Sequence, residues 1–317
     1  MADLFNAGAS NSDSVTNPGG AGGTLNGITY TGSSIGYSGT VVGNLNLKPE
    51  KSDTWNIGAV FSPTFIPGLS VSADYFRISI KDGIGTLSAQ EIVNRCFQGN
   101  AALCAAITAD PAASTTRILI RNQPFNFANQ LVRGFDFDAS YRIGMDRLFD
   151  GANGAFTLRG LATYYLDNII DQGLPNVLLF DSVGVNGGQG STPKWIFRAS
   201  ASYETNNFSI TATGRGISSG KYSAASIECT TGCPALTSGA QQNTVDDNHL
   251  PGLFYVDLNL TQKVTVDDRT SGQFFINVTN VFNKSPLILP ETGLAANSTY
   301  SDMLGRQFRI GFRAEYK

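Results

Sequence analysis

Residues 305–316 near the end of the chain read GRQFRIGFRAEY, a stretch in which apolar and polar side chains alternate without a break. Phe308, Ile310 and Phe312 fall on one face, and Arg309 and Arg313 fall on the other. Because side chains of a β-strand alternate with period two, the stretch predicts a strand with one apolar and one polar side. A tilted strand of about ten residues can cross the hydrocarbon of a bilayer, and an edge strand of a soluble sheet is the alternative.

The composition favours one large β domain. The chain has 317 residues, 35 of them glycine, with 10% aromatic and 15% charged residues. No apolar run reaches the length of about 18 residues that a transmembrane helix needs, which excludes a helical membrane protein. A mean hydropathy of −0.07 is compatible with transmembrane strands, whose apolar residues stand at alternate positions. A formal net charge of −3 excludes the basic surface of a nucleic-acid binder.

The same alternation recurs after Thr54 and predicts nine strands in all. They span residues 54–61, 69–80, 117–141, 156–164, 195–203, 208–214, 253–260, 274–278 and 308–316. Short turns and long polar segments alternate between them, which is typical of an outer-membrane barrel and not of a sandwich. A shift of the apolar phase predicts a bulge near Tyr75. The segment 83–115 predicts a short helical excursion within a loop.

The first 46 residues look different from the rest. They are rich in Gly, Ser, Asn and Thr and carry no periodic apolar pattern, so we expect a flexible lead-in or an extracellular loop without a core. The residues after Met1 form neither the cationic region nor the apolar segment of a signal peptide. We therefore expect the natural protein to extend upstream.

Four stretches carry a recognisable pattern: GNLNLKPEKSD (43–53), LVRGFDFDASY (131–141), NVTNVFNK (277–284) and DMLGRQF (302–308). Together they resemble the TonB-dependent outer-membrane receptors. The resemblance implies an all-β fold, with residues 47–317 as the C-terminal part of an antiparallel transmembrane β-barrel of about nine strands, long extracellular loops and short periplasmic turns. It also implies a location in the bacterial outer membrane. Nothing in the sequence resembles the family's plug domain or its TonB-contacting segment.

The resemblance implies energy-coupled uptake of a scarce ligand such as a siderophore, a vitamin B12-like cofactor or an oligosaccharide. A small passive porin and a soluble β-rich binding module are the alternatives. The partners would be outer-membrane lipid, a small-molecule or glycan ligand, and a plug domain and TonB through residues outside this chain, so the chain alone should not transport. We expect no enzyme and no cofactor, because the chain has one histidine, His249, and lacks a Gly-x-Ser-x-Gly motif and a phosphate-binding glycine loop.

The strand alternation assigns side chains to two faces. An outer, lipid-facing set is expected to contain Trp55, Ile57, Phe135, Phe137, Trp195, Phe197, Phe254, Val256, Phe308, Ile310 and Phe312. Charges near the middle of a bilayer each cost about 2 to 4 kcal/mol, so the polar set should line the lumen. This lumen-lining set contains Asp136, Asp138, Arg142, Arg159, Arg198, Glu204, Arg215, Asp257, Asn259, Asn277, Arg309, Arg313 and Glu315.

Ligand capture in the resembled family falls to the extracellular loops. Loop aromatics and amides are therefore the candidate ligand-binding residues, and a girdle or loop-packing role is the alternative for each of them. The candidates are Asn122, Gln123, Phe125, Asn126, Phe127, Tyr222, Gln241, Gln242 and Tyr300. The acidic pair Asp246 and Asp247 is expected to be solvated loop.

Four cysteines form two local pairs, Cys96 with Cys104 and Cys229 with Cys233. Both pairs lie in polar, loop-like stretches, and an oxidising compartment would make them disulfides. A zinc site is the alternative, but the lone His249 has no ligand partner at i+3 or i+4. We expect two disulfides and no metal site.

Overall fold

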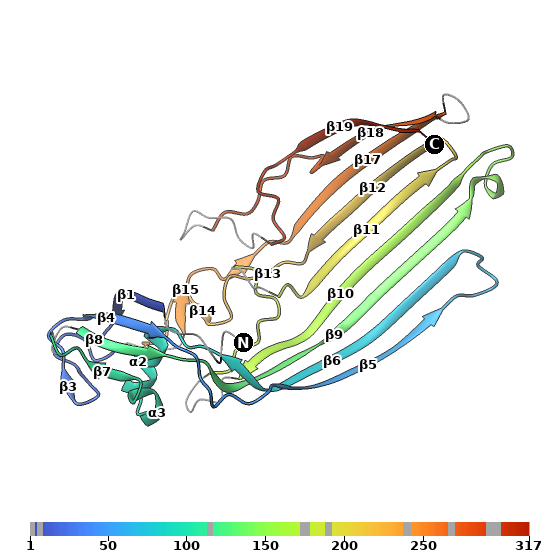
Figure 1. Cartoon of the computed structure of the whole chain (residues 1–317). Coiled ribbons are helices and arrows are strands. Elements are labelled where there is room, and N and C mark those ends of the chain that lie inside the picture. The colour runs from blue at the N-terminus through green and yellow to red at the C-terminus, as the bar shows by residue number, and fades with distance from the viewer. Residues whose placement is uncertain are drawn as a thin grey trace.

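The computed structural model describes residue 4 and residues 9–112, 117–171, 178–187, 192–236, 242–265, 270–289 and 299–316. Nine long antiparallel strands lie side by side in one sheet (Figure 1). In sheet order they are β5 (Lys51–Phe61), β6 (Leu69–Gly85), β9 (Phe125–Gly144), β10 (Ala155–Asp171), β11 (Trp195–Glu204), β12 (Phe208–Ile217), β17 (Leu253–Thr265), β18 (Thr270–Thr279) and β19 (Gln307–Tyr316). This confirms the prediction of nine strands, each paired with its neighbour in the chain.

The register of the strands places all apolar side chains of the predicted outer set on one face of the sheet. Directly paired residues of neighbouring strands point to the same side of a sheet, so the pairs trace rows across it. One such row runs from Ile210 through Leu260 and Ile276 to Ile310. All eleven residues of the predicted outer set fall on this face, and the side chains of Trp55 and Ile310 are 62% and 75% exposed. The prediction that they share a face is confirmed.

A tight turn joins β5 to β6 and requires glycine at its end. Gly68 has a φ of +91°, and a Cβ there would stand 2.0 Å from the carbonyl oxygen of Arg142. The amide of Arg142 donates a hydrogen bond to the Gly68 carbonyl at 2.9 Å. The turn therefore packs against the neighbouring strand β9, and any larger residue would push the two apart.

A small module lies beyond the loop ends of β5, β6 and β9 (Figure 1). Its four-stranded sheet has the order β1 (Ala9–Thr16), β4 (Ser34–Val41), β8 (Arg117–Asn122) and β7 (Ile107–Ala109). The pair β2 (Thr24–Leu25) and β3 (Ile28–Thr29) and the helices α2 (Ala89–Phe97) and α3 (Ala101–Cys104) complete it. The helices confirm the predicted helical excursion within 83–115.

The expectation of a flexible segment without a core is wrong for residues 9–41. Val15, Tyr30 and Ile35 join Ile92 and Ile118 in the largest buried cluster of the described residues. Strand β4 pairs in parallel with β8, so the core is assembled from two segments about eighty residues apart. Neither segment carries enough apolar residues for a core by itself, which is why no pattern was visible in residues 1–46.

Two further expectations are corrected. The register of β6 is regular through Tyr75, and its irregularities lie between Ile80 and Ile84 instead. The predicted strand 117–141 is divided into β8 and β9, because Pro124 has no amide hydrogen to donate to a ladder.

Shorter elements complete the connections between the long strands. They are η1 (Met145–Arg147), β13 (Gly220–Lys221) paired with β16 (His249–Leu250), and β14 (Ser226–Glu228) paired in parallel with β15 (Asn243–Val245). Among the described residues, no helix combines the length and the apolar character needed to cross a bilayer.

Candidate functional site

The predicted lumen-lining residues share the face opposite to Phe308 and Ile310. Asn259, Asn277 and Arg309 stand in one row of this face, and Arg198 stands opposite Arg215 in another. The Arg159 guanidinium is 2.8 Å from the Asp138 carboxylate. We call this the inner face; that it borders a lumen stays a prediction.

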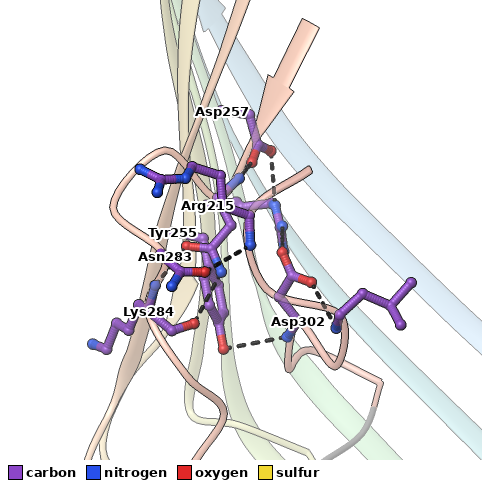
Figure 2. Close-up of polar contacts among 9 residues, drawn as sticks. Arg215, Tyr255, Asp257, Asn283, Lys284 and Asp302 are labelled. Carbon is purple, nitrogen blue, oxygen red and sulfur yellow. Dashed lines mark hydrogen bonds and ion pairs between the residues drawn. The ribbon is translucent and has the colours of Figure 1, made fainter. Parts of the chain in front are cut away.

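Arg215 is the centre of a polar network at the loop end of the inner face (Figure 2). Its Nε donates to the Asp257 carboxylate at 2.9 Å, and its Nη2 lies 3.4 Å from the Asp302 carboxylate. The guanidinium also lies over the ring of Tyr255, 4.9 Å from its centroid. The Tyr255 side chain is only 1% exposed, and its hydroxyl accepts a hydrogen bond from the Asp302 amide at 3.2 Å. Two carboxylates and one ring thus hold a single cation.

Two asparagines connect this network to the C-terminal strand. The buried Asn280 donates its amide hydrogen to Asp257 at 2.9 Å, and its side chain forms two hydrogen bonds of 2.9 Å with the backbone of Lys284. The Asn283 side chain accepts from the Arg306 amide at 2.9 Å. Both asparagines have positive φ, which asparagine tolerates better than most residues. The stretches 277–284 and 302–308 are therefore parts of one local structure.

A pocket of about 340 Å³ lies beside this network on the inner face. Thr163, Ile196, Arg198 and Arg215 line its wall, and Tyr300 lines it from the last loop. We call it the inner-wall pocket. Arg198 is exposed, and no ion pair within the described residues engages it, in contrast to Arg215. Burial raises the pKa of the Tyr300 hydroxyl above its ordinary value, and the group is a neutral donor at physiological pH.

A second pocket of about 550 Å³ lies among the loops that follow β12 and β18. We call it the loop pocket. Tyr222, Leu287 and Leu289 form its apolar side, and Asp246 and Asp247 add exposed carboxylates. Leu287 packs against the buried cluster of the loop pocket and also against that of Tyr255 near the inner wall. Leu287 of the loop pocket thus packs against the same cluster as Ile196 and Tyr300, two residues of the inner-wall pocket.

Two of the predicted ligand-binding residues line these pockets. Tyr222 belongs to the loop pocket and Tyr300 to the inner-wall pocket. Gln123 and Gln242 line neither of them. Gln241 lies outside the described residues, and of Phe125 and Phe127 only the backbone is described.

The two remaining candidates, Asn126 and Asn122, bind the backbone of their own chain. Asn126 forms hydrogen bonds of 2.7 and 2.8 Å to the amide and carbonyl of Lys48, and a third of 2.7 Å to the Asp82 carbonyl. It therefore anchors the stretch that precedes β5. Asn122 donates to the Leu87 carbonyl at 2.7 Å within the small module.

Tyr255 and Asp302 were absent from the predicted site. Tyr255 stands in the middle of a strand, and its partner Asp302 is 47 residues away, so no local spacing links them. Asp302 could have been found, because it opens the stretch DMLGRQF.

Both predicted disulfides are present. Cys96 bonds Cys104 with a Cα separation of 4.6 Å, and Cys229 bonds Cys233 with a Cα separation of 5.6 Å. Within the described parts of the chain, no group of three or more His, Cys, Asp or Glu residues could hold a metal ion.

Comparison with known proteins extends these observations. The ferric enterobactin receptor (PfeA) of Pseudomonas aeruginosa, as a mutant in complex with enterobactin, is 17% identical with a TM-score of 0.55, over 96% of this chain and 35% of that chain. The siderophore receptor PirA of Acinetobacter baumannii is 16% identical with a TM-score of 0.52, over 97% and 36%. The FrpB iron transporter of Neisseria meningitidis is 16% identical with a TM-score of 0.52, over 87% and 33%.

These identities support a shared fold alone, and the chain spans about a third of the length of these proteins. No curated protein sequence matches. A family model described as TonB dependent receptor-like, beta-barrel, matches residues 5–281. The chain therefore belongs to the TonB-dependent receptor family, as part of its β-barrel.

Proposed function

We propose that this chain forms part of the barrel wall and of the loops of a receptor for energy-coupled uptake of a scarce ligand across the bacterial outer membrane. The plug domain and the contact to TonB would come from the remainder of the protein. The observation that supports this proposal best is the packing of Leu287 of the loop pocket against the same buried cluster as two residues of the inner-wall pocket, because a ligand leaving the loop pocket would then pass Leu287 on its way to the inner wall.

The chemistry of the two pockets suits a ligand with both ring and polar groups. The loop pocket offers Tyr222 and aliphatic side chains, which favour apolar and aromatic groups. The inner-wall pocket offers the Arg198 guanidinium, which no ion pair in the described part of the chain engages, and the neutral hydroxyl of Tyr300. Both groups can donate hydrogen bonds to oxygen atoms. A ferric siderophore presents such oxygens and is the first candidate, because the similar structures are described as siderophore and iron receptors. A vitamin B12-like cofactor or an oligosaccharide comes second.

Uptake can be tested in a bacterial strain that lacks its own siderophore receptors and expresses this protein at its natural length. We expect accumulation of radiolabelled iron from a ferric siderophore to be saturable and to stop when a protonophore collapses the proton gradient. Accumulation that continues without the gradient and rises linearly with ligand would show a passive porin instead. A protein absent from the membrane fraction would show a soluble module.

Two substitutions connect uptake to the pockets. Arg198→Gln and Tyr222→Ala should each weaken binding of the same siderophore to whole cells by roughly tenfold, since each removes one hydrogen bond or ring contact in a partly dry site. Arg313→Gln is the matched control, because Arg313 lies on the inner face outside both pockets. Equal affinities of all three variants and the parent protein would exclude these pockets from the ligand path.

A further inference from the structure

A row of aromatic side chains crosses four strands of the outer face near the loop end. Tyr75, Phe135, Tyr164 and Trp195 are directly paired from β6 to β11. The rings of Tyr75 and Phe135 are 5.4 Å apart, and those of Tyr164 and Trp195 are 4.6 Å apart. Aromatic rows of this kind mark the boundary between hydrocarbon and headgroups.

Basic side chains appear on the outer face one row beyond the aromatic row, toward the loop end. The next row contains Arg77, which stands opposite Arg133 on one side and Trp55 on the other, and two steps further Lys51 stands opposite Lys81. Lys194 lies over the Tyr164 ring at 5.5 Å. We call Lys51, Arg77, Lys81, Arg133 and Lys194 the basic belt. Successive residues on one face of a strand are about 7 Å apart, so the belt lies at headgroup height if the aromatic row lies at the boundary.

The positive charges of the basic belt outnumber the carboxylates near them. Arg133 forms an ion pair with Asp167, but no ion pair within the described residues engages Lys51, Arg77 or Lys81. Two further carboxylates lie on this part of the outer face: Asp53 stands opposite Ser79, and Asp171 of β10 stands opposite Asn129 of β9.

Like charges directly opposite each other on neighbouring strands destabilise a sheet, and the belt contains two such pairs. A bound anion between them would remove this penalty. Arginine and lysine are the side chains that best hold phosphate, and exposed cations at a membrane surface each add about 1 kcal/mol of attraction to anionic lipid.

We propose that the basic belt binds the phosphate groups of a phosphorylated lipid in the membrane leaflet next to the long loops. The inference rests on the proposed location of the protein in the outer membrane, with the loops outside. It does not depend on the transported ligand, because no residue of the belt lines either pocket.

The test compares lipids that differ in phosphate alone. The protein at its natural length is inserted into phosphatidylcholine vesicles that contain either diphosphoryl lipid A or its fully dephosphorylated form. We expect the phosphorylated lipid alone to raise the unfolding midpoint, by an amount that falls with added salt. The triple variant K51Q/R77Q/K81Q should bind it roughly 100-fold more weakly, from about 1 kcal/mol for each cation lost.

The control K263Q/R309Q/R313Q removes the same charge from the inner face and should keep the parent's affinity. If the triple variant does not fold, the single variant Arg77→Gln is measured in its place and should also bind the phosphorylated lipid more weakly than the parent. A triple variant that responds like the parent, or inorganic phosphate that stabilises the parent as strongly as the lipid, would overturn the proposal. Protease protection reports insertion separately: a protein that does not insert contradicts the proposed location, whereas an inserted protein indifferent to lipid phosphate contradicts only the belt.

Discussion

Tyr255 and Arg215 hold the returning C-terminal loop against the inner face. The Tyr255 hydroxyl is the acceptor for the Asp302 amide, and the Asp302 carboxylate reaches back to Arg215 (Figure 2). The loop is thus fastened at one residue by two different groups. The Arg215 side chain is 32% exposed, so solvent screens the ion pair and we expect the buried hydroxyl to contribute more than the charge.

Tyr255→Phe should loosen this attachment without disturbing the sheet. Loss of one buried hydrogen bond costs about 1 kcal/mol, so the backbone amides of residues 299–306 should exchange with deuterium about five times faster. Tyr141→Phe is the control, because no hydrogen bond of the Tyr141 side chain is found among the described residues. Unchanged exchange in residues 299–306 of the Tyr255 variant would show that the loop is held elsewhere.

Tyr300, in the same loop, should make the stability of the protein depend on pH. Burial raises the pKa of its hydroxyl above the usual value of 10.0, so the folded protein binds this proton more tightly than the unfolded chain. The associated stability is fully present below pH 10 and is lost as the pH rises through the higher pKa of the folded state. Denaturant midpoints measured from about pH 9 to 12 should therefore fall less steeply for Tyr300→Phe than for the parent. Parallel curves for the two proteins would contradict this assignment.

At the scale of elements, the nine long strands and the helices of the small module were predictable, and the sheet and core of that module were not. Successive side chains of a strand point to opposite faces, so the faces of Arg309 and Ile310 can be predicted from the alternation of polar and apolar residues in a short stretch of sequence. The core of the module instead joins Ile35 of β4 to Ile118 of β8, and no short window of sequence contains both. The contact between Arg215 and Asp302 could not be predicted for the same reason, because the two residues are 87 positions apart in the sequence.

The Cys96–Cys104 disulfide should matter most to this module. Cys96 is 4% exposed and belongs to the same buried cluster as Val93 and Leu103. Replacement of both cysteines by serine should cost about 2 kcal/mol, because a short closed loop is released and two polar groups enter a core. Amides of α2 should then exchange roughly 30 times faster. The double Cys229→Ser/Cys233→Ser variant, whose disulfide lies in an exposed loop, should leave α2 unchanged; equal effects of the two pairs would refute the special role of the first.

At the scale of the whole molecule, the sheet separates its side chains into two consistent faces. Trp55 on β5 and Phe312 on β19 belong to the same face, although seven strands lie between them. A slip of one residue in any pair would turn a whole strand over, so the register of each strand depends on both faces at once. The exposed apolar face has no covering layer within the described residues, as a lipid-facing surface requires.

Ile310→Arg tests which face meets lipid. Ile310 lies in the middle of β19, in a row with Ile276 and Leu260, and an arginine near the bilayer midplane costs about 2 to 4 kcal/mol. The free energy of unfolding in vesicles should fall by that amount. Thr261→Arg places the same side chain on the inner face of β17, where water can solvate it, and should cost less than about 1 kcal/mol. If Thr261→Arg proved the more damaging substitution, the inner face would be the one in contact with lipid, and the assignment of both faces would have to be reversed.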